Sequence, residues 1–130
     1  MSTRNTYVAA TLMAISLAIS ACEDKGATPP PPSLAGDWTV TNETSRVESL
    51  LELDHRGDNL TGFWHPGVLS IRVTGHITSS NEFRLTGQSN NRTYVFDAEA
   101  NDGLSRFAGS LSVYDVRGDR VSLQMISGRR

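Results

Sequence analysis

Apolar and polar residues alternate along most of the chain beyond Leu34. In residues 69–77 the odd-numbered positions are apolar or glycine, and the even-numbered positions are polar. The same alternation recurs in residues 83–87, 107–113 and 121–125. A period of two is typical of β-strands that bury one face, and no later segment keeps a helical period. The pattern therefore predicts an all-β domain.

Turn signals divide this domain into eight predicted strands. Pro66-Gly67 suits a type II turn, and two near copies, DHRGD at residues 54–58 and DVRGD at 115–119, place glycine where a type I turn ends. The predicted strands start near Asp37, Val47, Asn59, Leu69, Glu82, Thr93, Ser105 and Arg120. All connections are short, so strands that are neighbours in sequence should also pair in space.

Such a succession of strands forms either a sandwich or a closed barrel, and four glycines favour the barrel. Gly62, Gly75, Gly87 and Gly109 all fall on the predicted inward face, where glycine lets a strand bend at a barrel corner. We predict an eight-stranded antiparallel up-and-down β-barrel. On the same parity, Val121, Leu123 and Met125 of the last strand are predicted to point inward.

The predicted interior is almost entirely apolar. A barrel of eight strands is wide enough to be filled by side chains or to hold one small ligand, and the sequence leaves both readings open. For a hollow barrel we predict an apolar ligand and four lining residues, Trp64, Tyr94, Phe96 and Phe107.

The chain starts with a different kind of segment. Residues 1–21 contain Arg4 and then a short uncharged apolar run, which predicts a secretory signal peptide and is too short for a membrane span. Residues 22–33 hold Cys22, the only cysteine, and a proline-rich stretch that predicts an extended tether. The barrel domain is then expected to occupy residues 34–130.

The quartet ISAC at residues 19–22 resembles the bacterial lipobox. This resemblance implies that Cys22 receives a diacylglyceryl thioether, that the signal peptide is cut before it, and that the protein is anchored to a membrane of the cell envelope. Glu23 stands where lipoproteins retained at the inner membrane often have aspartate, so the outer membrane is favoured in a cell that has one.

The start of the barrel domain resembles the calycins, the superfamily of lipocalins and avidins. Gly36 and Trp38 form the G-x-W motif of its first strand. The resemblance implies that Trp38 closes one barrel end and is stacked by an arginine of the last strand, for which Arg129 has the predicted parity. The later tryptophans that surround biotin in avidins are missing, which argues against biotin. L-A-G-x-W-x-V after such a signal also resembles lipoprotein inhibitors of metalloproteases, although those carry a disulfide.

Composition and motifs exclude several classes of function. The net charge is −2 and cations do not cluster with aromatic residues, so no nucleic-acid partner is expected. The sequence has no catalytic motif such as G-x-S-x-G or H-E-x-x-H and no convergent set of metal ligands. We predict a monomeric, non-catalytic binding module without metal or cofactor. Its partner is either a small hydrophobic ligand or an envelope protein recognised by the loops.

Lipidation of Cys22 predicts that the protein partitions into detergent and that Cys22→Ser leaves an uncleaved or soluble form. Intact-mass spectrometry of the membrane fraction measures this directly, because the acyl chains add a defined mass to residue 22. An unmodified Cys22 in that fraction would refute the anchor.

Overall fold

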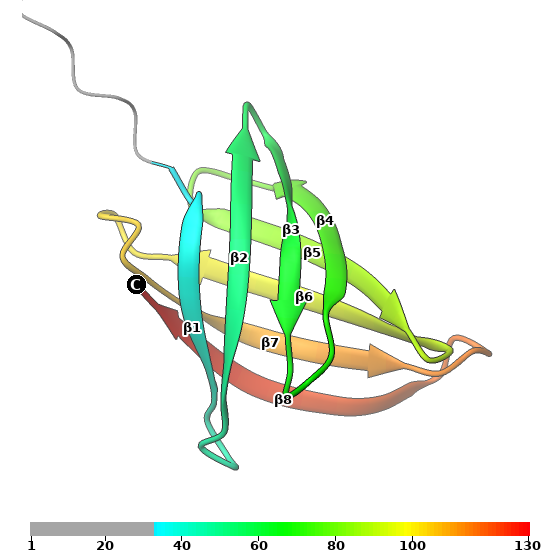
Figure 1. Ribbon diagram of the computed structural model, residues 1–130. Helices are drawn as coiled ribbons and strands as arrows, with labels where there is room; N and C mark the ends of the chain where they lie inside the picture. Colours follow the sequence, from blue (N-terminus) through cyan, green and yellow to red (C-terminus); the bar gives the residue numbers. More distant parts are fainter. Residues whose placement is uncertain (1–32) are drawn as a thin grey trace, which may run out of the picture. The chain divides into compact units, whose positions relative to one another are not determined.

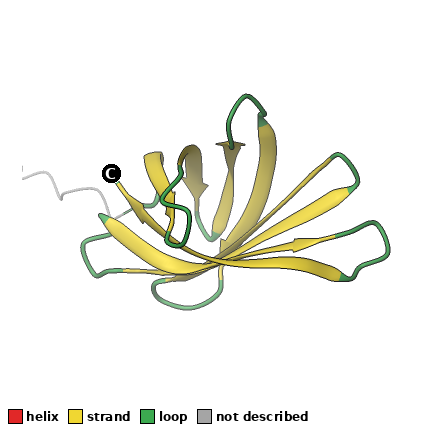
Figure 2. Ribbon diagram, turned by 90° about the horizontal axis from the view of Figure 1, so that it is seen from below, coloured by secondary structure: helices red, strands yellow, loops and turns green. Residues whose placement is uncertain are grey.

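Eight strands follow one another along residues 33–130, the part of the chain that the computed structural model describes (Figure 1). Each begins within two residues of its predicted start. The strands are β1 (Gly36–Asn42), β2 (Glu48–Arg56), β3 (Asn59–His65), β4 (Ile71–Ile77), β5 (Glu82–Ser89), β6 (Arg92–Ala100), β7 (Arg106–Tyr114) and β8 (Arg120–Arg129). Strands and loops alone make up this part of the protein (Figure 2).

The strands form a closed barrel in which each pairs antiparallel with its neighbour in sequence. The predicted up-and-down β-barrel is therefore confirmed. β1 and β8 close it through four residue pairs, from Thr39 opposite Arg129 to Asn42 opposite Ile126. The β2–β3, β4–β5 and β6–β7 turns and both ends of the described chain lie at one end of the barrel, at the upper left of Figure 1. We call this the closed end, and the opposite end, with the other four turns, the mouth.

The inward glycines allow neighbouring strands to cross closely inside the barrel. A Cβ atom on Gly75 would lie 1.7 Å from the carbonyl oxygen of Arg84 in β5. A Cβ atom on Gly62 would lie 1.8 Å from the carbonyl oxygen of Glu52. Real Cβ atoms do not approach backbone oxygens so closely, so these positions exclude every side chain. Two of the four glycines that the sequence predicts on the inward face, Gly62 and Gly75, thus lie at close strand crossings.

Large side chains fill the closed end. Trp38, Phe83 and Phe107 are buried there, and the ring centroid of Phe107 lies 5.1 Å from that of Trp38 and 5.3 Å from that of Phe83. Leu85, Val73 and other buried aliphatic residues continue this core toward the mouth. The closed half of the barrel is therefore packed.

β8 turns inward the face that the sequence predicts to be outward. Val121, Leu123 and Met125 lie on the outer wall, with exposed fractions of 48%, 53% and 56%. The inward positions belong instead to Gln124, Ile126 and their alternate neighbours.

The reason for this parity is steric. Gly128 faces Phe107 across the β7–β8 pair, and a Cβ atom on Gly128 would lie 2.1 Å from the Phe107 ring. Only glycine fits opposite that ring, so position 128 must be inward and the odd-numbered residues on either side of it outward. The three alternating apolar residues of β8 therefore remain exposed.

The turn between β7 and β8 is organised by one carboxylate. The backbone N–H groups of Asp119 and Arg117 donate to Oδ1 of Asp115 at 3.0 and 2.9 Å. The bond from Asp119 lowers the pKa of Asp115 most, and the bond from Arg117 lowers it further. The stability that these bonds give the folded protein is therefore present at neutral pH and is lost as the pH falls through the lowered pKa. Gly118 adopts a φ of 89° beside it, as the turn requires.

Gly75→Ala is expected to destabilise the barrel by about 1–3 kcal/mol, because the new methyl group meets the backbone of β5 and cannot be accommodated by a side-chain rotation. Urea unfolding of residues 33–130, followed by far-UV circular dichroism, measures the change. Gly103→Ala is the matched control, since a Cβ atom there meets nothing within 4 Å. Equal stability of the two variants would contradict the steric argument.

Candidate binding site at the barrel mouth

A pocket of about 360 Å³ opens at the mouth of the barrel. Its volume is within the usual range for small-molecule sites, about 300–1,000 Å³. The lining residues are Val40, Asn42, Ser45, Val47, Glu48, Ser49, Trp64, Pro66, Gly67, Tyr94, Leu111, Val113, Gln124 and Ile126. Most of this surface is apolar or aromatic, so the pocket suits an apolar group.

Trp64 is the largest side chain of the pocket lining. Its indole Nε1 donates a hydrogen bond of 2.9 Å to Oγ of Ser49, which fixes the ring plane. Tyr94 approaches the ring edge-on with centroids 5.4 Å apart, and Phe96 does so at 5.0 Å. Because Trp64 is held by three neighbours, it forms a rigid wall that a ligand meets without further ordering of that side chain.

Two amide side chains brace the rim where β1 meets β8. Nδ2 of Asn42 donates to Oε1 of Gln124 at 2.6 Å, and Nε2 of Gln124 donates to Oγ of Ser122 at 3.0 Å. Oδ1 of Asn42 accepts from the backbone N–H groups of Thr44 and Ser45. Sequence reasoning missed this pair because it placed Gln124 on the outer wall.

Two of the four predicted lining residues, Trp64 and Tyr94, line the pocket. Phe96 is wholly buried and packs against Trp64 within the core. Phe107 lies in the closed half with Trp38. Phe96 and Phe107 do not line this pocket, because the aromatic residues are spread along the barrel axis and do not form one layer.

Trp38 is wholly buried at the closed end. The arginine stacked on its ring is Arg130 and not the predicted Arg129. The guanidinium carbon of Arg130 lies 4.6 Å from the Trp38 ring centroid. Arg130 also donates to the backbone oxygens of Ala35 and Ser33. Arg129, the predicted partner, points outward and forms an ion pair of 3.1 Å with Glu48. The shift by one residue follows from the inward position of Gly128.

His55 fastens the start of the domain to the same end. Its Nδ1 accepts a hydrogen bond of 3.0 Å from the backbone N–H of Leu34, and its Nε2 lies 2.9 Å from the carbonyl oxygen of Gly57. A backbone N–H can only donate and a carbonyl can only accept, so these partners select the neutral Nε2–H tautomer. Leu34 in turn accepts from Nε1 of Trp38 at 2.9 Å.

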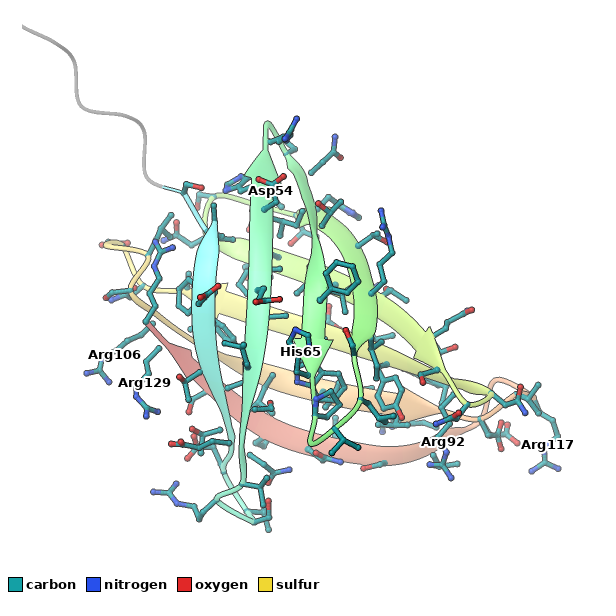
Figure 3. The ribbon with its side chains drawn as sticks, in the orientation of Figure 1. Asp54, His65, Arg92, Arg106, Arg117 and Arg129 are labelled. Carbon is teal, nitrogen blue, oxygen red and sulfur yellow. The ribbon has the colours of Figure 1, made fainter. Side chains whose placement is uncertain are left out.

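The other histidines lie elsewhere. His65 projects from the outer wall (Figure 3), where Nε2 lies 2.9 Å from Oε1 of Glu52. His76 of β4 pairs through its backbone with Asn59 and Arg84. Within residues 33–130 no three histidine, cysteine, aspartate or glutamate side chains gather as a metal site would need.

A larger groove, of about 690 Å³, crosses the outer wall over β1, β8 and β7. Its charged side chains largely satisfy one another: Arg46 binds Glu43 at 2.9 Å and Arg129 binds Glu48 at 3.1 Å. Arg106 projects beside Arg129 toward solvent (Figure 3). Exposed pairs of this kind contribute little, so the groove is a solvated charged face and the mouth pocket remains the candidate site.

No protein-family model matches the chain, and no curated protein is significantly similar to it. In residues 33–130 the structure has no helix long and apolar enough to cross a membrane. The predicted lipid-attachment residue, Cys22, lies outside the described residues.

The Arg130 cap predicts an energetic coupling with Trp38. Trp38→Leu and Arg130→Ala should be less than additive in a double-mutant cycle, with a coupling of about 0.5–2 kcal/mol from the cation–π contact. Urea unfolding midpoints of the single and double variants measure it. Arg129→Ala is the control: it removes only an exposed ion pair and should show no coupling to Trp38. A coupling to Arg129 and none to Arg130 would overturn the assignment.

Proposed function

We propose that this protein is a lipid-anchored lipoprotein of the bacterial cell envelope whose barrel is a non-catalytic binding module, and that it takes a small apolar group into the mouth pocket. The observation that carries the proposal is the distribution of exposed apolar side chains. They gather at the mouth loops and on the strands that lead to them: Val47, Leu50, Phe63, Val68, Leu69, Val116, Val121, Leu123 and Met125. Exposed apolar surface around a pocket is typical of a binding end.

The chemistry of the pocket supports binding over catalysis. Neither histidine nor cysteine occurs among the lining residues. Ser49, the hydroxyl nearest the Trp64 wall, is occupied as the acceptor of the indole N–H. Glu48, the one lining carboxylate, is paired with Arg129. A nucleophile with a general base beside it is therefore not found among the side chains that line this pocket.

The described chain enters the barrel at the closed end, opposite the mouth. The described chain starts at Ser33 at the closed end, and ten residues separate it from Cys22. An extended chain covers at most about 3.6 Å per residue, so a lipid on Cys22 would keep the closed end within roughly 40 Å of the bilayer. We infer that the mouth is free to face away from the membrane. The outer membrane is favoured by Glu23, and a monomer suffices for this arrangement.

The alternative is a barrel that acts through its loops, as a protease inhibitor or an envelope interaction module. The packed closed half favours this alternative to the extent that it leaves no deep cavity for a long ligand. The two functions share the mouth, and they differ in whether a free small molecule binds there.

N-phenyl-1-naphthylamine, an apolar dye that emits strongly in apolar surroundings, is expected to bind residues 33–130 with increased emission. Gln124→Trp should weaken binding at least tenfold, because the new ring points into the pocket from the rim. Leu123→Trp is the matched control, since the neighbouring side chain lies on the outer wall. Fluorescence titration measures both. No emission change with the unmodified barrel would refute the ligand site and leave the loop-mediated function.

A further inference from the structure

β8 extends past the end of its partner β1. The pairing between them stops at Asn42 opposite Ile126, whereas β8 begins at Arg120. Residues 120–124 therefore have a neighbour on one side only, β7, and pair with it across a bulge: Ser122 pairs with Val113 and Arg120 with Tyr114, which leaves Val121 as the extra residue. Figure 1 shows the β7–β8 hairpin continuing toward the mouth beyond the point where β1 turns into β2.

The free side of this segment presents backbone groups ready to pair. In an antiparallel ladder the N–H and C=O of one residue point to the same neighbour, and successive residues alternate between neighbours. The carbonyl of Met125 accepts from the N–H of Glu43, on the β1 side. Leu123, two residues earlier, points its N–H and C=O to that side too, where no described backbone group pairs with them.

This edge borders the mouth pocket. Gln124 and Ile126 of β8 line the pocket, and so do Ser45 and Val47 of the β1–β2 connection. Leu123 and Val47 have exposed apolar side chains. An unpaired strand edge pairs readily with other chains, so proteins that do not use one normally cover it or interrupt it.

The arginines at the mouth end of the open edge favour an acidic partner. Arg120 begins the open edge and has no acidic partner among residues 33–130, whereas Arg117 in the adjoining turn is held by Asp115 and Asp119. Arg92, at the same tip of the barrel (Figure 3), also has no ion pair among the described residues. The mouth end of the open edge is therefore complementary to a carboxylate.

We propose that residues 120–124 of β8 bind an extended polypeptide segment as an additional antiparallel strand, which inserts an apolar side chain into the mouth pocket and presents a carboxylate to Arg120. The inference rests on the proposed function, because it uses the same pocket, and it names the partner: a peptide segment of another envelope protein. Backbone pairing supplies affinity in such strand addition, and the pocket supplies selectivity.

The register of the pairing specifies the segment. A partner residue opposite Gln124 points inward, as Gln124 does, and enters the pocket. The next residue, opposite Leu123, exchanges two backbone hydrogen bonds with it and points outward. An antiparallel segment then continues past Ser122 to the bulge, where Val121 is the extra residue and Arg120 takes the next position in the ladder. An acidic residue is therefore expected two positions after the one opposite Leu123. The predicted order is apolar, apolar, any residue, acidic.

The probe is the peptide Gly-Gly-Thr-Leu-Val-Ser-Glu-Thr-amide, with fluorescein on its amino terminus. Fluorescence anisotropy measures its binding to the full-length protein, purified from membranes and placed in lipid nanodiscs, with empty nanodiscs as the blank. Leu123→Pro should weaken binding at least tenfold, because it removes the N–H that faces the peptide and not a bond to β7. Leu123→Ala keeps that N–H and should weaken binding less.

Two further binding experiments test the pairing without placing a proline in β8. A peptide N-methylated at its valine lacks the N–H that donates to Leu123 and should lose binding to the unmodified protein. Arg120→Glu should weaken binding of the original peptide at least tenfold, and replacing the peptide's glutamate by lysine should restore it. Restored binding would show that the carboxylate meets Arg120.

The outcomes separate this inference from the proposed function. Dye binding in the pocket without peptide binding would overturn the strand addition and leave the proposed function intact. Peptide binding that is insensitive to N-methylation and to Leu123→Pro would also overturn it. A stable dimer in sedimentation experiments that Leu123→Pro dissolves would assign the edge to a second copy of the chain and would likewise overturn the inference. Failure of the dye to bind would refute the ligand site of the proposed function, whether or not the peptide binds.

Discussion

The contact between Gly128 and the ring of Phe107 fixes which face of β8 belongs to the interior. No side chain fits at position 128 opposite that ring, so the strand must turn glycine toward it. Ile126 then joins the core, Gln124 reaches the rim, and Arg130 comes within 4.6 Å of the Trp38 ring centroid. The same constraint places Leu123 on the outside. The cap at one end and the edge at the other thus depend on one steric fit.

The interior of the barrel differs between its two ends. At the closed end, Trp38, Phe83 and Phe107 meet in one packed layer. At the mouth, Trp64 and Tyr94 also meet edge-on, but side chains such as Ser49 and Val113 border a pocket beside them. An eight-stranded barrel has an interior that side chains can just fill, so space remains only where the side chains of a layer leave it. The closed half is packed, and the pocket lies in the mouth half.

The sequence was a good guide wherever a feature depends on neighbouring positions. Alternation located all eight strands, and the parity of Gly62 and Gly75 identified two close strand crossings. It failed for β8, because three alternating apolar residues are a strong local signal and the clash at Gly128 involves a ring 21 positions away in the chain. Trp64 and Tyr94 were found because they share the mouth layer. The bond between Asn42 and Gln124 could not be found once the face of β8 was assigned wrongly.

The opening beside β8 is determined by Asn42 as much as by the length of β1. Its Oδ1 binds the N–H groups of Thr44 and Ser45, so the chain turns toward β2 immediately after the last pair with β8. Its Nδ2 binds Gln124, so a side-chain hydrogen bond holds β8 beyond the last backbone bond, which Glu43 donates to Met125. A longer β1 would seal the barrel and cover the edge at Leu123. One side chain therefore ends the closure of the barrel and stabilises the strand left open, which makes the edge a fixed feature of the fold and not a frayed end.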